Sequence, residues 1–248
     1  MNKFNLVYMS AVCLCLLGFI SVTEATIIQT ASGFSATGDA VSFKSLLTIS
    51  DNILTVQLFN ISPLSTNSPD DLLSSYFFDI RKSDGQRAML NYLSATGDVY
   101  KTSKNSADTL KIIGANLKAV NSGDNTWKFL SLNSEYNPFL GFGIGTVGNS
   151  SMSPNNFPGN IVGNMDYSIY TGDVTTQSLH NRMFVKNSAT FTFSGLMGFA
   201  EANIANSFAF GLGTAPESML IVSMPPNIPE PATIALLCLG GLFLTKKS

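Results

Sequence analysis

Cysteine is absent from the middle of this chain. The three cysteines among the 248 residues are Cys13, Cys15 and Cys238, and each of them lies in an apolar run near one end. The polypeptide between these runs therefore has no thiol for a disulfide, a thiolate metal site or a cysteine nucleophile. Its stability must come from a hydrophobic core and from the pairing of its backbone.

Charge and histidine are also scarce. Charged residues make up 12% of the sequence, the net charge is −2, and no run of basic residues is long enough to neutralise a row of phosphates, so we expect no binding of nucleic acid. His180 is the only histidine. A catalytic triad would depend on that residue, and no Gly-x-Ser-x-Gly motif accompanies it. We therefore expect a protein that is not an enzyme, with no catalytic residues, no metal ion and no cofactor.

The first 25 residues have the pattern of a secretory signal peptide. Lys3 precedes an apolar stretch at 6–20, and Thr23-Glu24-Ala25 places small residues three and one positions before a cut. We expect export through the secretion translocon and cleavage after Ala25.

The end of the chain carries a second apolar segment. Its uninterrupted run at 232–245 would form a helix about 21 Å long, against about 30 Å for the hydrocarbon core of a bilayer. Lys246 and Lys247 can reach the far interface and keep that end on the cytoplasmic side. The segment is therefore expected to span a membrane only with the help of its flanking residues.

Three parts occur in order at this terminus: the tripeptide Pro229-Glu230-Pro231, a short hydrophobic helix with Gly240-Gly241, and a basic end. This order resembles the PEP-CTERM sorting signal of bacterial surface proteins. The resemblance implies a membrane-embedded exosortase that recognises the tripeptide, removes the helix, and releases or attaches the body at the cell surface. On this reading the short helix holds the protein in the inner membrane only for a time. These tails more often end in arginine, whereas this chain has lysine, which supplies the same charge.

The body between the two ends, residues 26–226, reads as short strands separated by turns. The segment NILTVQLFN places Leu54, Val56 and Leu58 on one face, which is the two-residue period of a strand. Turns are expected at four Gly-Asp pairs, Gly38-Asp39, Gly97-Asp98, Gly123-Asp124 and Gly172-Asp173, and Ser68 before Pro69 predicts one short helix. We expect an all-β domain, an antiparallel β-sandwich or a jelly-roll-like fold, followed by the sorting segment at 227–248. Further strands are expected at 41–49, 76–80, 110–113, 127–132, 167–170, 189–195, 206–213 and 219–222.

The body carries a second resemblance. The stretches LGFGIGTVGN, GNMDYSIY, ATFTFSGL and NSFAFGLGTAPES resemble a domain found in a class of exosortase-dependent surface proteins. Because these stretches are strand and turn patterns, the resemblance bears on the fold.

Other residues suggest chemistry only weakly. Gly143, Gly145 and Gly148 have the spacing of a dinucleotide fingerprint, but the sequence that follows cannot form the required helix. Asp79 with Asp84 or Glu135 could serve a glycoside hydrolase, and the alternative for such acids is a solvated turn. Asp39, Asp70, Asp71 and Asp173 could bind calcium, although not in a recognised calcium-loop spacing. The aromatic rings that could stack on a sugar are Trp127, Tyr136 and Phe139, and such rings are more often core residues.

The preferred interpretation is an exported surface or extracellular-matrix protein, processed at Pro229-Glu230-Pro231 and associated with exopolysaccharide or biofilm. The alternatives are a carbohydrate-binding module, with Trp127 and Tyr136 as glycan contacts, or a secreted glycoside hydrolase.

Overall fold

The computed structural model describes residues 25–103, 107–118, 126–131, 141–147, 165–213 and 219–223. This part of the chain consists mostly of β-strands, as the sequence predicted, with three single-turn 3-10 helices. Among these residues there is no helix with the length and apolar character needed to cross a membrane. The helices expected within 1–25 and 227–248 fall outside the described residues.

The strands in chain order are β1 (Thr26–Phe34), β2 (Ala40–Ser50), β3 (Ile53–Asn60), β4 (Leu73–Phe78), β5 (Asn91–Lys101), β6 (Thr109–Asn116), β7 (Lys128–Ser131), β8 (Phe142–Gly145), β9 (Ile169–Tyr170), β10 (Met183–Ser194), β11 (Ser207–Leu212) and β12 (Met219–Ser223). The 3-10 helices are η1 (Pro69–Asp71), η3 (Gln177–Leu179) and η4 (Glu201–Asn203).

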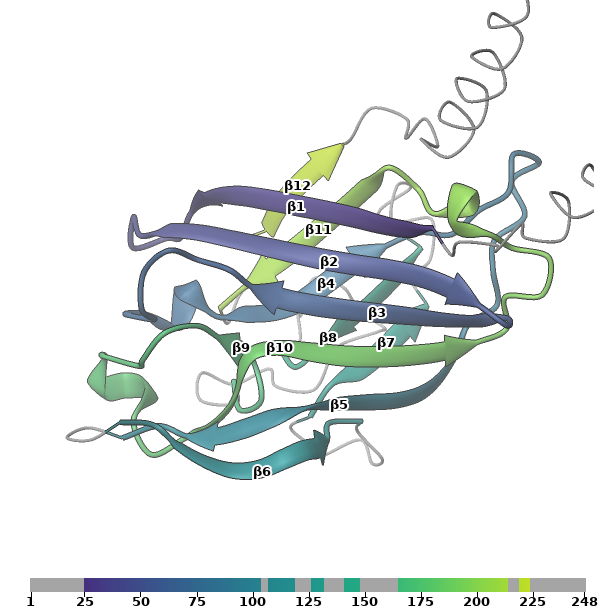
Figure 1. Cartoon of the computed structure of the whole chain (residues 1–248). Helices are drawn as coiled ribbons and strands as arrows, with labels where there is room; N and C mark the ends of the chain where they lie inside the picture. The colour runs from purple at the N-terminus through teal and green to yellow at the C-terminus, as the bar shows by residue number, and fades with distance from the viewer. Residues whose placement is uncertain are drawn as a thin grey trace, which may run out of the picture.

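The strands form two layers (Figure 1). The front layer has the order β1-β2-β3-β10-β5-β6, and the back layer has the order β12-β11-β4-β8-β7. Short strand β9 joins them, since Ile169 pairs in parallel with Val185 of β10 and in antiparallel with Leu73 of β4. The sheet is therefore mixed, which corrects the expectation of a purely antiparallel sheet. The other pairs of named strands are antiparallel.

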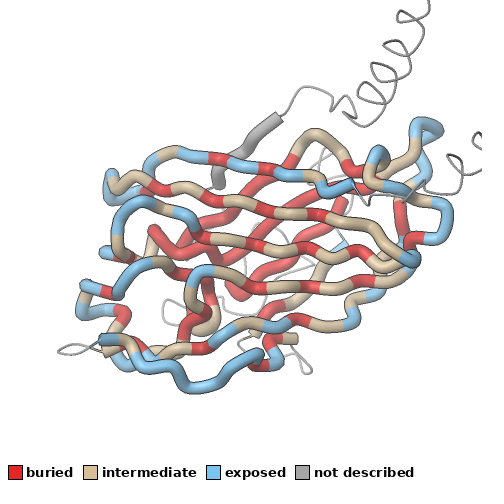
Figure 2. The backbone as a smooth tube through the Cα atoms, in the orientation of Figure 1, coloured by how far each residue is buried: buried red, intermediate tan, exposed pale blue. Residues whose placement is uncertain are grey.

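The hydrophobic core lies between the layers. In β3, buried residues alternate with half-buried ones, and Leu54, Val56 and Leu58 point inward as predicted. Aromatic rings then bridge the layers: the centroids of Phe43 and Phe210 are 5.8 Å apart, and such pairs contribute about 0.5–1.5 kcal/mol each beyond their buried area. Figure 2 shows this alternation along the front layer, with almost continuous burial behind it.

Two turns connect the first three strands of the front layer. Gly38, with a φ of 89°, lies in the turn from β1 to β2, as its Gly-Asp pair predicted. Asp51 and Asn52 have φ angles of 50° and 64°, so two residues with positive φ connect β2 to β3. This backbone suits the right-handed twist of a hairpin, and Asn and Asp tolerate it better than other side chains with a Cβ.

Two further local predictions have different outcomes. Ser68 caps η1, because its hydroxyl accepts a hydrogen bond from the backbone N–H of Asp70, which confirms a short helical turn after this residue. The predicted turn at Gly97-Asp98 is wrong, since both residues lie within β5. The register shifts between Gly97 and Val99, so this glycine marks a β-bulge.

Candidate functional site

The residues of the predicted sorting signal, Pro229, Glu230, Pro231, Lys246 and Lys247, lie outside the described residues. So does Tyr136. Ala25, where signal cleavage is expected, is the first described residue and is exposed, and β1 begins at the next residue.

Trp127 is placed in the core. Its side chain is fully buried, its ring packs edge-on against Phe191 at 4.9 Å between centroids, and its indole N–H donates to the carbonyl of Tyr167 over 2.9 Å. An indole in this position has no face available to a sugar at the surface. The structure thus corrects the expectation that Trp127 contacts a glycan, and it supports the alternative of a core aromatic residue.

Two arginines surround the carboxylate of Asp79, the residue that follows β4. Its carboxylate is almost completely buried; Oδ2 lies 2.8 Å from Nη2 of Arg81 and Oδ1 lies 3.0 Å from Nε of Arg87. Oδ1 also accepts the backbone N–H of Ile80. Because both oxygens are engaged, Asp79 anchors the 81–87 hairpin and is not available as a glycosidase acid or nucleophile.

The other candidate acids are dispersed. Asp84 is exposed and accepts the backbone N–H of Gln86 over 2.8 Å, which is the role of a turn residue, and Glu135 lies outside the described residues. Within the ranges that the structure describes, there is no group of three or more His, Cys, Asp or Glu side chains that could hold a metal ion. Asp39, Asp70, Asp71 and Asp173 are therefore not gathered into a calcium site of that kind.

The glycine fingerprint also has a structural explanation. Gly143 and Gly145 lie in β8, which pairs in antiparallel with both β4 and β7. A dinucleotide site requires these glycines in a turn that leads from a parallel strand into a helix. Their position within a buried antiparallel strand excludes that use.

A polar cluster is buried between the layers near β1. Gln29, Ser45 and Tyr76 are all inaccessible to solvent, and the Tyr76 hydroxyl donates to Oε1 of Gln29. Oγ of Ser45 lies 3.2 Å from each of these two oxygens. Burial raises the pKa of Tyr76 above its usual value, so this phenol stays neutral and acts as a donor.

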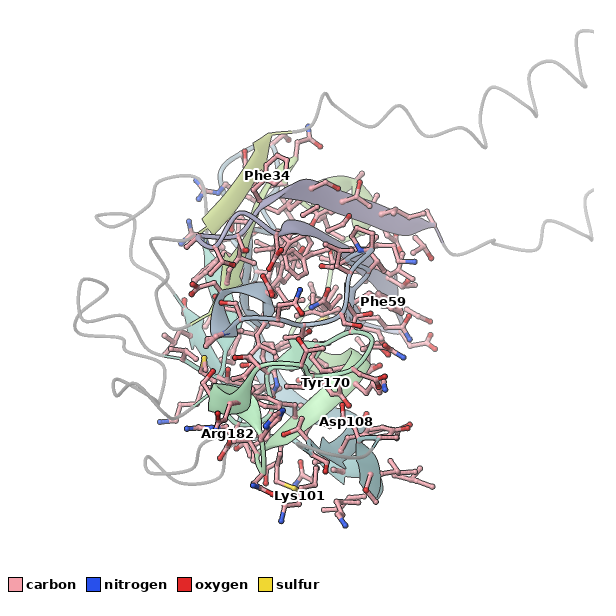
Figure 3. The ribbon with its side chains drawn as sticks, turned by 90° about the vertical axis from the view of Figure 1, so that its left-hand side faces the viewer. Phe34, Phe59, Lys101, Asp108, Tyr170 and Arg182 are labelled. Atoms are coloured by element: carbon pink, nitrogen blue, oxygen red, sulfur yellow. The ribbon has the colours of Figure 1, made fainter. Side chains whose placement is uncertain are left out.

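A second group of polar side chains includes Tyr170 and Asp108, which lie close together (Figure 3). Burial raises the pKa of Tyr170, and the negative charge of Asp108 raises it further. Nζ of Lys186 lies 5.4 Å from the centroids of both Tyr100 and Tyr170, and 3.4 Å from Oδ1 of Asp173. These contacts hold loop 171–176 against β10, which is a structural role.

The outward surface of the front layer carries a regular array of polar side chains. Strand register places Thr26, Thr48, Thr55, Thr192 and Ser94 side by side in one row across five strands. Hydroxyl groups of neighbouring strands are 3.1 Å apart in the pair Thr26–Thr48 and 2.6 Å apart in the pair Ser94–Thr192.

Two more rows run parallel to the first. The second contains Ile28, Leu46, Gln57, Thr190 and Thr96. The third contains Thr30, Lys44, Phe59 and Ser188. We call these three rows the hydroxyl face. All of its members are exposed or half-buried.

Sequence reasoning did not find this face, although one signal was present. The segment 189–195, predicted as a strand, carries Thr190, Thr192 and Ser194 at every second position, and Ser188 continues this series just before it. What the sequence does not contain is the register that aligns them with residues of β3 and β5.

A comparison of the chain with known protein families, with curated proteins and with solved structures gave no match. The function must therefore be argued from the residues themselves.

Proposed function

We propose that this chain is an exported surface or extracellular-matrix protein with a non-catalytic β-sandwich body. It is processed at Pro229-Glu230-Pro231 by an exosortase-type membrane enzyme. The observation that carries the proposal is the order of three parts at the terminus: the acidic tripeptide between prolines, a hydrophobic segment too short to span a bilayer comfortably, and Lys246-Lys247.

The proposal depends on where the tripeptide lies relative to the membrane. The lysines anchor the segment at the cytoplasmic interface, and Pro231 suits the first turn of a helix, where its missing N–H is not needed. Glu230 then lies at the positive end of the helix dipole, at the outer membrane surface. An enzyme embedded in the same membrane can reach the tripeptide there, and cleavage frees the body.

The body is suited to this use. It contains no cysteine, so it requires no disulfide formation after export. Its core is large and aromatic, and the buried acid Asp79 is neutralised by arginines. A carbohydrate-binding role within the matrix is the second candidate, and the hydroxyl face is the observation that favours it.

The test is the intact mass of the cell-associated and released protein, measured in cells with and without the sorting enzyme. We expect the C-terminal segment to be lost only when the enzyme is present. Glu230→Ala should retain the segment and remain in the inner membrane, while Asn227→Ala, just outside the tripeptide, should be processed normally. Normal processing of Glu230→Ala would overturn the proposal.

A further inference from the structure

We propose that the hydroxyl face is the ligand-binding surface of the protein and that its ligand is a neutral polysaccharide. This inference rests on the proposed function, in which the body works within an extracellular polysaccharide layer. It adds the surface and the class of ligand.

The first argument is the unused hydrogen-bonding capacity of the face. A hydroxyl group has one donor and two acceptor sites, so a pair such as Ser94–Thr192 uses one donor and one acceptor and leaves the rest to solvent. Within the described part of the protein, no side-chain hydrogen bond engages Thr55, Gln57 or Thr190. Donors and acceptors are thus presented together, which matches the hydroxyl groups of a sugar.

The second argument is charge. Lys44 is the only charged side chain in the three rows, and its ammonium group lies 4.5 Å from the centroid of the Phe59 ring. About a quarter to a third of the surface positions of a soluble protein are usually charged. A surface with one charge offers no attraction to nucleic acid, to an anionic lipid or to an acidic polymer. It favours a neutral partner.

The third argument is spacing and shape. Neighbouring strands are about 4.7–4.9 Å apart, so a chain lying across the strands along the first row meets a hydroxyl group at each step of that length. Ile28, Leu46 and Phe59 lie in the second and third rows beside the hydroxyl groups and offer apolar surface to the C–H faces of sugar rings. Figure 3 shows Phe59 on this outward side of the front layer.

The fourth argument is rigidity. The rows are carried by five hydrogen-bonded strands, and the inward residues of the same strands, among them Leu58 and Phe191, are fully buried. The backbone of the face is therefore fixed before a ligand arrives, which reduces the entropy that binding must overcome.

The experiment measures binding of the purified full chain to three named polymers: insoluble cellulose by sedimentation, and dextran and alginate by affinity electrophoresis. We expect binding to at least one of the two neutral glucans and none to anionic alginate. The double variant Thr55→Val, Thr190→Val keeps the branched shape of both side chains and removes two hydroxyl groups. It should bind about tenfold more weakly or worse, since each lost hydrogen bond contributes a several-fold change.

The matched control is Thr109→Val, at an exposed position of β6 outside the three rows, which should bind as the unaltered chain does. The emission of Trp127, the only tryptophan, reports whether each variant is folded. If the double variant unfolds, Thr96→Val, at an exposed position of the second row, takes its place and should weaken binding several-fold.

Three results would overturn the inference: no binding to cellulose or dextran, equal binding by the double variant and the unaltered chain, or preferential binding to alginate. The proposed function is tested separately, by the intact mass of the Glu230→Ala variant. A chain that is sorted normally but binds no neutral glucan would retain the proposed route and lose this ligand.

Discussion

Gly141 lies directly against the ion pair of Arg87 and Asp79. A Cβ atom at this glycine would come within 2.2 Å of Oδ1 of Asp79 and 2.6 Å of Nε of Arg87. The close approach brings the backbone just before β8 against a buried carboxylate, so the ion pair in this position requires a residue without a Cβ atom at 141.

Gly141→Ala should therefore separate Asp79 from Arg87 and destabilise the body by about 3 kcal/mol or more, the usual effect of breaking a buried ion pair. Urea unfolding followed by Trp127 fluorescence measures the change. The control is Gly38→Ala, which meets no atom within 4 Å but sits at a φ of 89°. Its backbone strain should amount to about 1–2 kcal/mol. Equal losses in the two variants would contradict the steric explanation.

Tyr76→Phe should destabilise the body by about 1–3 kcal/mol, because Gln29 and Ser45 would remain buried without the phenol that they share. The same unfolding assay applies. Tyr92→Phe is the comparison: its hydroxyl makes a single long bond of 3.4 Å to the carbonyl of Trp127, so its loss should matter less. A larger effect at Tyr92 than at Tyr76 would disprove the importance of the buried cluster.

Three of the tyrosines that the structure describes should resist ionisation in the folded protein. Burial raises the pKa of Tyr76, Tyr92 and Tyr170 above the ordinary value of 10.0. Above pH 10 the unfolded chain therefore loses these protons first, and the free energy of unfolding falls as the pH rises. Phenolate absorbance should show an incomplete titration that is completed only on alkaline unfolding. A complete titration of the folded protein near pH 10 would contradict this result.

Asp166→Asn should alter the pH dependence of stability. Partial burial raises the pKa of this carboxyl above 3.8, and Arg182 at 3.9 Å offsets the effect only in part. The folded state thus holds the proton more tightly than the unfolded state, so the contribution of Asp166 declines as the pH rises from 3.8 through its raised pKa. Unfolding measured from acid to neutral pH should favour the variant progressively. Parallel curves would show that the carboxyl has no such role.

The sequence predicted β3 and β10, because inward and outward residues alternate along each of these strands. The inward positions of β3 and the phenylalanines of β10 follow from a two-residue period. Strand β5 was not identified, because Gly97-Asp98 has the composition of a turn. In the structure a Cβ at Gly97 would lie 2.8 Å from Cγ1 of Val185. Because it has no Cβ atom, this glycine allows β5 and β10 to come close together. A pattern within one segment of the sequence cannot show that contact.

The candidate sites also differ in whether their residues are consecutive in the chain or are brought together by the fold. The sorting tripeptide, whose parts are consecutive in the chain, lies outside the described residues and stays a prediction. The hydroxyl face could not be predicted, because Thr55 and Thr192 become neighbours only through the pairing of β3 with β10. Trp127 was considered as a glycan contact but lies in the core. The sequence alone does not show whether an aromatic ring lies in a core or at a surface.

The position of β10 has a consequence for the order of assembly. This strand inserts between β3 and β5, although it follows both of them by many residues. A chain that emerges from a translocon amino end first has β1–β3 and β5–β6 outside as separate sheets with open edges, and neither can close against the other until residues 183–194 arrive. On the proposed export route, the front layer could be completed only after residues 183–194 had crossed the membrane, and this late closure suits a route that carries unfolded chains.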